Sequence, residues 1–388
     1  MFSKRIRNVR PSGTVMLANK VKRLKKQGLD ILSFTLGEPD FSTPKHIVEA
    51  CKDALDSGMT HYGSSLGVME LREAIAKNVK DKNGVDARME NIIVMPSKFA
   101  ILSALQTFVS PGDKVLIPNP GWVSYGPMVQ LAGGTPVPVK MKYEDSWKWY
   151  PEDIRAHVTP KCKAIILNTP SNPMGGVMDE KALREIVDIA IEKDLLIIAD
   201  EVYENLIYEG KHFSVQSIDE AFERIITVSG FSKSYAMTGW RVGWLVANEE
   251  AIKMINKIMQ HSLTCVPPFI QMGALKAIND GQADIDRMKE EFRKRRDFVI
   301  PRLNEIDSIS CEVPKGAFYA FFKMDVGFNS MDLAEMLLYK THVALTPGTA
   351  FGSASSNYMR MSYAASMNEL EEGVSRIKNF TDEITRSI

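Results

Sequence analysis

One lysine of this sequence, Lys233, stands in a setting that favours chemistry. It lies in a short turn within 229–243, between apolar runs at 224–228 and 242–246 that have the length and the β-branched or aromatic residues of strands. An amine at the end of a buried strand is partly desolvated, which lowers its pKa and makes it a nucleophile for a carbonyl carbon. A lone loop lysine is more often simply solvated, so the Schiff-base chemistry with a pyridoxal cofactor that Lys233 suggests needs support from other residues.

Polar side chains also follow three other apolar runs, where predicted strands end. In an open α/β sheet, ligands bind at the carboxyl ends of the strands. We therefore expect these side chains to gather around one site, although each alone could cap a helix, hold a turn or pair with a surface charge. They are Asn172 after 163–167, Asp200 and Tyr203 after 195–199, and Ser97 and Lys98 after 91–95.

These residue types match the needs of a pyridoxal 5'-phosphate site. A carboxylate has to hold a proton on the pyridine nitrogen, because only the protonated ring accepts electrons from the substrate carbanion. Donors have to face the ring oxygen, and a hydroxyl, a guanidinium and free helix amides can bind the phosphate. The candidates are Asp200 for the nitrogen, Asn172 and Tyr203 for the oxygen, and Ser232, Arg241 and the helix start at Ser97 for the phosphate.

The order of the elements predicts an α/β fold, with a mostly parallel central sheet flanked by helices and a smaller α+β domain. Apolar runs alternate with helix-period segments, and a chain of 388 residues exceeds the size of one core. We expect an N-terminal arm with part of the small domain at 1–44, a large cofactor-binding domain at 45–284 and a small domain at 285–388. Besides those above, the predicted strands are 114–117, 317–322 and 358–363, and the predicted helices are 71–79, 180–191, 285–304 and 369–388.

Composition excludes several classes of function. Lysine plus arginine and aspartate plus glutamate each total 48, so no net charge draws the protein to nucleic acid or to an anionic membrane. The four cysteines have no CxxC spacing, which argues against a zinc site or a disulfide framework and suits a reducing cytoplasm. No apolar run approaches the length of a membrane span, and we expect no metal.

Taken together, the motifs resemble the fold-type I pyridoxal-phosphate aminotransferases of class I and II, the aspartate aminotransferase family. The resemblance covers nearly the whole chain. Its motifs are Pro11-Ser-Gly-Thr14, Leu36-Gly-Glu-Pro-Asp-Phe41, Tyr62-Gly-Ser-Ser-Leu-Gly67, Asn172-Pro-Met-Gly175, Asp200-Glu-Val-Tyr203, the segment from Ser232 to Arg241, and Tyr358-Met-Arg360.

The resemblance implies a role for each motif residue. Lys233 would form the internal aldimine, and Trp122 would stack on the cofactor ring. Arg360 would clamp the substrate α-carboxylate, with the Gly37 backbone nearby. Asp200, Asn172, Tyr203, Ser232 and Arg241 would take the cofactor roles already given.

A homodimer with shared active sites is also implied, because in such enzymes Tyr62 reaches the phosphate of the neighbouring subunit. The chain departs from the family in two places. Pro96 and Ser97 replace residues that are often glycine, and Gly230 stands where some members have a phosphate-binding serine. Phosphate binding would then depend more on Arg241 and Ser232.

The expected reaction is a ping-pong exchange of an amino group between an L-amino acid and a 2-oxo acid through Lys233. A bacterial-type aspartate subgroup resembles this chain in Ser12, Thr14 and Lys98, which would receive the distal carboxylate. A lysine at a helix start opposes the helix dipole, so an anionic partner there is plausible, although Lys98 could equally point to solvent. We expect aspartate and 2-oxoglutarate as substrates.

Several alternatives remain open. An aromatic or broad-specificity aminotransferase, or a β-lyase, would share the same cofactor residues. Gly63-Ser-Ser-Leu-Gly67 matches the nucleophile elbow of hydrolases, but no buried strand is predicted before it. A catalytically silent binding domain on the same fold is disfavoured by the joint presence of the site residues.

Overall fold

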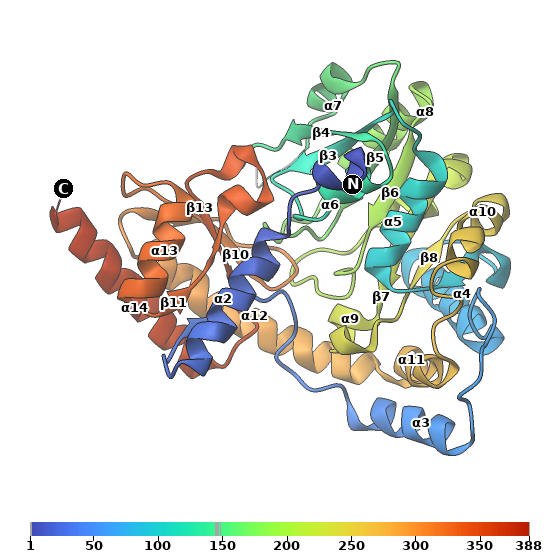
Figure 1. The fold of residues 1–388 in the computed structure, drawn as a ribbon, viewed down its shortest axis with the longest axis horizontal. Helices are drawn as coiled ribbons and strands as arrows, with labels where there is room; N and C mark the ends of the chain where they lie inside the picture. The colour runs from blue at the N-terminus through green and yellow to red at the C-terminus, as the bar shows by residue number, and fades with distance from the viewer. Residues whose placement is uncertain (1, 144–146, 148, 388) are drawn as a thin grey trace.

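The computed structural model describes residues 2–143, 147 and 149–387 and has two lobes (Figure 1). Within the described residues, the larger lobe is built on a seven-stranded sheet, the large sheet. Only β8 runs antiparallel to its neighbours, so the sheet is mostly parallel, as predicted. In spatial order the strands are β2 (Ile92–Val94), β8 (Gly243–Val246), β7 (Ile225–Gly230), β6 (Leu196–Asp200), β5 (Cys162–Asn168), β3 (Lys114–Asn119) and β4 (Thr135–Lys140).

Sequence reasoning predicted every strand of the large sheet except β4. Its sequence, Thr-Pro-Val-Pro-Val-Lys, contains Pro136 and Pro138, which cannot donate to a sheet ladder. Since β4 is the last strand of the sheet and pairs with β3 alone, one of its sides needs no sheet partner. An edge position therefore tolerates the prolines that hid the strand.

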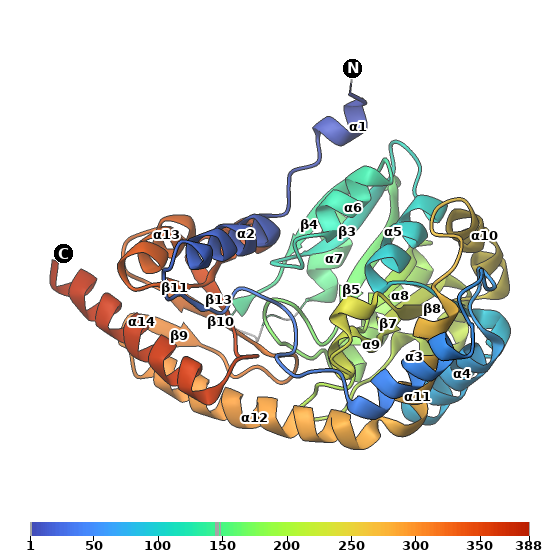
Figure 2. The ribbon, with the colours of Figure 1, turned by 60° about the horizontal axis from the view of Figure 1, so that its bottom comes forward.

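Helices cover both faces of the large sheet (Figures 1 and 2). The apolar residues of the strands divide between two buried clusters, one with Ile198 and Val228 and the other with Ile197 and Ile225, as side chains alternate along each strand. The helices of this lobe are α3 (Lys45–Asp56), α4 (Met69–Asn83), α5 (Ser97–Phe108), α6 (Tyr125–Leu131), α7 (Pro151–His157), α8 (Glu180–Glu192), α9 (Phe231–Ser234), α10 (Glu249–Gln260) and α11 (Pro268–Asp280).

The smaller lobe packs helices against a second sheet with its own apolar core. Within the described residues, this small sheet has four strands in the order β12 (Thr346–Pro347), β13 (Tyr358–Ser362), β10 (Tyr319–Met324) and β9 (Ile309–Cys311). A separate parallel pair joins β1 (Leu32–Ser33) to β11 (Val343–Ala344). The helices are α2 (Gly13–Lys26), α12 (Gln282–Asn304), α13 (Ser330–Lys340) and α14 (Met367–Ser387).

Helix α12 runs under both lobes, with α14 beside it (Figure 2). Its bounds agree with the predicted charged helix, and its buried face includes Phe292 and Val299 of the small-lobe core. The N-terminal helix α1 (Lys4–Arg7) lies at the end of an extended segment. The domain boundaries at 44/45 and 284/285 stay a prediction. No helix in the described part of the chain is long and apolar enough to cross a bilayer.

Candidate active site

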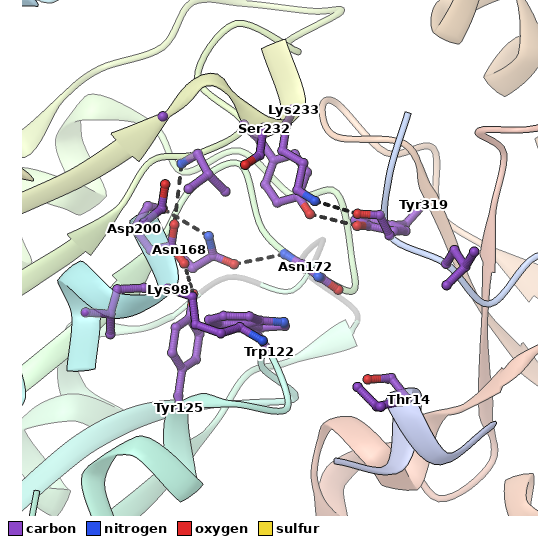
Figure 3. A pocket seen from close by; sticks show the side chains of 18 of the residues that line it. Thr14, Lys98, Trp122, Tyr125, Asn168, Asn172, Asp200, Ser232, Lys233 and Tyr319 are labelled. Carbon is purple, nitrogen blue, oxygen red and sulfur yellow. Dashed lines mark hydrogen bonds between the residues drawn. The ribbon is translucent and has the colours of Figure 1, made fainter. Parts of the chain in front are cut away.

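A cavity of about 470 Å³ opens at the carboxyl ends of the central strands, between the lobes. Asp200 and Lys98 lie on one side of it, Tyr319 and Thr14 on the other, and Asn172 between them (Figure 3). Sequence reasoning had predicted twelve of the lining residues: Thr14, Gly37, Ser97, Lys98, Trp122, Asn172, Asp200, Tyr203, Ser232, Lys233, Arg241 and Arg360.

Lys233 enters the cavity from α9, a single helical turn that directly follows β7. Its Nζ donates a hydrogen bond of 2.6 Å to the carbonyl oxygen of Gly37. Burial lowers the pKa of Lys233 to about 8, the nearby Glu38 charge opposes this, and the Arg241 charge adds to it. Part of the amine is therefore neutral near physiological pH, as a nucleophile requires.

Asp200 is the last residue of β6 and is fully buried. Its Oδ2 accepts a 2.6 Å hydrogen bond from the Tyr125 hydroxyl, and its carbonyl oxygen accepts one of 2.9 Å from Asn168 Nδ2. Burial raises the pKa of Asp200 to about 6, although the Tyr125 bond acts in the opposite direction. Its Oδ1 accepts only a long 3.4 Å bond from the Val202 amide among the described residues, so it can take a further donor.

Arg360 lies on β13 and meets Asn172 from the other lobe. Its guanidinium donates to Asn172 Oδ1 at 3.0 Å and to the Thr35 carbonyl at 2.7 Å, while its Nε is buried without a hydrogen-bond partner among the described residues. Asn172 is itself held by a 2.9 Å bond from its amide to Asn168 Oδ1. A buried, unpaired N–H is costly, so Arg360 is prepared for an additional acceptor.

The predicted phosphate ligands lie around the start of α5 and the turn after α9. Ser232 directly precedes Lys233. Arg241 has a left-handed backbone with φ of 57°, and its guanidinium donates to the Thr238 carbonyl at 2.7 Å. Ser97, at the first residue of α5, donates to the Ser229 carbonyl at 2.9 Å.

Lys98 and Trp122 form one wall of the cavity. The Lys98 Nζ lies 4.9 Å from the centre of the Trp122 ring, within range of a cation–π contact. Burial lowers the pKa of Lys98, and the positive charge of Arg241 lowers it further. Thr14, near the start of α2, also lines the cavity.

Two predicted residues lie outside the cavity lining. The Ser12 hydroxyl lies 3.0 Å from the hydroxyl of Thr14, and of these two residues Thr14 alone lines the cavity. Ser12 is the residue that precedes α2, and its role as a substrate ligand stays a prediction. Tyr62 is 88% exposed. The segment 59–68 around Ser65 forms no strand, so the nucleophile-elbow alternative lacks its required element.

Sequence reasoning missed Thr35, Tyr125, Asn168 and Tyr319. Asn168 carried a usable signal, since it is the first residue after the apolar run 163–167. Tyr125 and Tyr319 carried none, because their hydroxyls meet Asp200 and Tyr203, which are distant along the chain.

The chain was compared with known proteins. The family model described as aminotransferase class I and II matches residues 30–377. The chain is 44% identical over 360 residues to the aspartate aminotransferase of Pyrococcus abyssi, covering 91% of this chain and 92% of that protein. It is 43% identical over 364 residues to the aromatic-amino-acid aminotransferase 2 of Thermococcus litoralis, covering 92% and 93%.

A solved structure agrees with these relatives. The aspartate aminotransferase from Thermus thermophilus with maleate superposes with a TM-score of 0.94 at 36% identity, covering 98% of this chain and 99% of that one. The chain belongs to the class I and II aminotransferases. As a member of this family it is a pyridoxal-phosphate-dependent enzyme acting on amino acids and 2-oxo acids, and its fold is the predicted fold type I.

The polar groups that line the cavity of this aminotransferase match those that pyridoxal phosphate needs. Asp200 offers a carboxylate with a free acceptor site, and Lys233 offers an amine of lowered pKa. Ser232, Arg241 and the first turn of α5 line the same cavity and can receive a phosphate. Arg360 lines the cavity as well, and its buried Nε has no hydrogen-bond partner among the described residues.

Proposed function

We propose that this enzyme transfers the amino group of L-aspartate to 2-oxoglutarate by a ping-pong mechanism. Pyridoxal phosphate, when bound, withdraws electrons from the α-carbon of the amino acid and so makes its proton acidic. Asp200 would hold the proton on the ring nitrogen, Asn172 and Tyr203 would donate to the ring oxygen, and Trp122 would pack on the ring.

The protein's own residues then orient the substrate and move its proton. Arg360 binds the α-carboxylate with a fork of two N–H groups, which fixes the α-carbon relative to Lys233. As a neutral amine, Lys233 Nζ would take the proton from the α-carbon as a general base. Its pKa of about 8 suits this step, because a base with a pKa close to the working pH is both available and strong enough.

The balance of charges in the cavity supports a dicarboxylic substrate. Besides Lys233, the described lining contains the cations Lys98, Arg241 and Arg360, whereas Asp200 is its only carboxylate. Arg241 serves the phosphate and Arg360 the α-carboxylate. Lys98 then remains for a second substrate carboxylate, with Thr14 available as a hydroxyl donor. This surplus cation is the observation on which aspartate specificity depends.

Replacing Lys233 tests the chemistry. We expect Lys233→Ala to fold and to lose measurable transamination, because neither the cofactor anchor nor the base remains. Borohydride reduction of the holoenzyme followed by peptide mapping should place the adduct at residue 233. Near-normal turnover by the variant, or an adduct elsewhere, would refute this role.

Replacing Lys98 tests the substrate. For Lys98→Ala we expect the ratio of kcat/KM for aspartate to that for phenylalanine to fall by about tenfold or more, since a charge-assisted hydrogen bond is worth roughly 1.5–3 kcal/mol. Lys257→Ala, at a basic residue in the last turn of α10 outside the cavity lining, is the control. An unchanged ratio would point to the alternative substrates.

An aromatic or broad-specificity aminotransferase is the second candidate. Val15, Leu36 and Ile101 line the cavity and offer apolar contacts. Lys98 can also rest on the Trp122 ring when no distal carboxylate is present. A β-lyase would use the same cofactor residues.

We further propose a cytoplasmic homodimer in which Tyr62 completes the partner's phosphate site. Tyr62 is 88% exposed and lies outside the lining of its own chain's cavity, so its hydroxyl is available to a second chain. The free thiols of Cys51, Cys162, Cys265 and Cys311 suit a reducing compartment.

A further inference from the structure

Tyr319 lines the cavity but has no role in the mechanism above. It is the first residue of β10 and is fully buried. Its hydroxyl lies 2.7 Å from the hydroxyl of Tyr203, and the guanidinium carbon of Arg360 lies 4.5 Å from the centre of its ring. The Tyr319 side chain, labelled in Figure 3, thus contacts both Tyr203, a proposed cofactor ligand, and Arg360, a proposed substrate ligand.

The hydroxyl pair has a preferred direction if Tyr203 serves the cofactor. A tyrosine hydroxyl carries a single hydrogen. Tyr203 can therefore donate it to the ring oxygen of the cofactor only if Tyr203 accepts the hydrogen bond from Tyr319. A Cβ at Gly37 would lie 2.5 Å from the Tyr319 hydroxyl oxygen, so this oxygen packs against the glycine backbone. Gly37 therefore limits the movement of the Tyr319 hydroxyl. This hydroxyl can act as the donor that turns the Tyr203 hydroxyl toward the cavity.

The ring of Tyr319 also restrains Arg360. The guanidinium carbon lies 4.5 Å from the centre of the Tyr319 ring and 4.9 Å from the centre of the Phe351 ring. Its hydrogen bonds to Asn172 and Thr35 hold its terminal nitrogens, while the two rings limit how far it can tilt. The orientation of the Arg360 guanidinium thus depends on contacts with two aromatic rings as well as on hydrogen bonds.

We propose that Tyr319 is a positioning residue that links the two halves of the site: its hydroxyl directs Tyr203 toward the cofactor, and its ring orients Arg360 toward the substrate. This inference rests on the roles proposed above for Tyr203 and Arg360. The two contributions are separable, because phenylalanine keeps the ring and leucine removes it.

The hydroxyl is tested by a pH titration of the near-visible absorption band of the holoenzyme. A donor at the ring oxygen draws off negative charge that would otherwise stabilise a proton on the cofactor-bound nitrogen of Lys233. In Tyr319→Phe the hydroxyl of Tyr203 is free to turn away, so the pKa of that nitrogen should rise by about 0.5–1 pH unit, the equivalent of one neutral hydrogen bond. The KM for the amino donor should stay within about twofold, since phenylalanine keeps the ring that contacts Arg360.

The ring is tested by Tyr319→Leu. Its KM for the amino donor should rise by about tenfold beyond that of Tyr319→Phe, which corresponds to losing one desolvated cation–π contact. Tyr363→Phe is the matched control. Tyr363 is equally buried and donates at 3.4 Å to the Ala317 carbonyl, but it does not line the cavity. It should change neither the titration nor the KM.

Tyr203→Phe separates failure of the link from failure of the proposed function. This variant should raise the same pKa, and adding Tyr319→Phe to it should cause no further rise. An unchanged titration in Tyr319→Phe, or an equal change in Tyr363→Phe, would overturn the link while leaving the roles of Tyr203 and Lys233 intact. An unchanged titration in Tyr203→Phe would overturn its cofactor role and the link with it.

Discussion

The two titrating groups nearest the chemistry, Asp200 and Lys233, are shifted in opposite directions by the same cause. Burial raises the pKa of the acid to about 6 and lowers the pKa of the amine to about 8. Neither has the other as a hydrogen-bond partner, since Asp200 bonds Tyr125 and Lys233 bonds Gly37. Both groups are thus held at a cost in stability and are available to a bound cofactor.

The cost at Asp200 predicts how the stability of the apoenzyme depends on pH. At Asp200, the folded protein binds more protons than the unfolded chain between the usual pKa of 3.8 and the folded value of about 6. The contribution of Asp200 to the free energy of unfolding therefore falls as pH rises through this window and stays low above it. We expect apo Asp200→Asn to be more stable than apo wild type at about pH 8, by at most about 3 kcal/mol, and nearly equal to it at about pH 4.

Thermal unfolding of both apo proteins at the two pH values measures this difference. The variant should at the same time bind pyridoxal phosphate more weakly, because it cannot hold the ring proton. Asp188→Asn, on the exposed side of α8, serves as the control and should change stability equally little at both pH values. A stability gain that does not depend on pH would contradict the assignment.

At the scale of elements, the cofactor end of the site depends on how closely β7, β8 and α5 approach one another. A Cβ on Gly230 would lie 2.4 Å from Ser97 Oγ and 2.9 Å from the Cα of Gly243. A Cβ on Gly243 would lie 2.3 Å from the same hydroxyl. Glycine at both positions lets the first turn of α5 sit directly above the strand ends. This packing explains why Gly230 stands where some relatives were expected to carry a serine.

Gly230→Ala should consequently disturb both the fold and the cofactor site. We expect a loss of about 1–3 kcal/mol in the free energy of unfolding, as for other overpacked cores, and a weaker affinity for pyridoxal phosphate because α5 is displaced. Urea unfolding and a fluorescence titration of the apoenzyme measure the two effects. Adding Ser97→Gly should recover part of both losses.

Gly239→Ala is the matched control for this variant, since an added Cβ there has nothing within 4 Å. It should leave stability within about 0.5 kcal/mol of wild type. Equal effects of the two alanines, or full affinity for the cofactor in Gly230→Ala, would argue against the close approach.

Most elements of the large sheet were predictable because buried parallel strands are continuous apolar runs, as in 163–167 and 195–199. The antiparallel direction of β8 was not predictable, because a short apolar run does not indicate in which direction the strand runs. The same limit applies to the site. Residues at strand ends, such as Asp200 and Asn172, follow from local sequence, whereas the contact of Arg360 with Thr35 joins residues 325 positions apart. Only the folding of the small lobe, where the segment after β1 runs beside β13, brings these two residues together.

At the scale of the whole molecule, several apolar side chains of the N-terminal third remain exposed. Phe2 is 72% exposed, Met16 60%, Tyr62 88% and Met69 55%. Helix α1 extends from the body on its own segment (Figure 2). For the homodimer proposed above, light scattering should give about twice the chain mass of 43.4 kDa.

A shared site makes a sharper prediction than the mass alone. If Tyr62 serves the partner's phosphate, each site combines its own Lys233 with the Tyr62 of the other chain. A hybrid of Lys233→Ala and Tyr62→Ala chains then contains one doubly defective site and one native site. Random exchange of equal amounts makes about half of the dimers hybrids, so about a quarter of all sites become native.

The inactive Lys233→Ala chain and the weakened Tyr62→Ala chain are mixed at a limiting concentration of pyridoxal phosphate. The transaminase activity of the mixture should exceed the mean of the activities of the two separate proteins. The gain should appear only after subunits have exchanged, for example after brief denaturation and refolding together. If Tyr62 instead served its own chain, every Tyr62→Ala site would keep its defect in the hybrid, and the mixture would show only the mean. A Lys233→Ala mixture with Tyr339→Ala, which alters an exposed tyrosine of α13, supplies the matched control, since its Tyr339→Ala chains should be as active alone as in the hybrid.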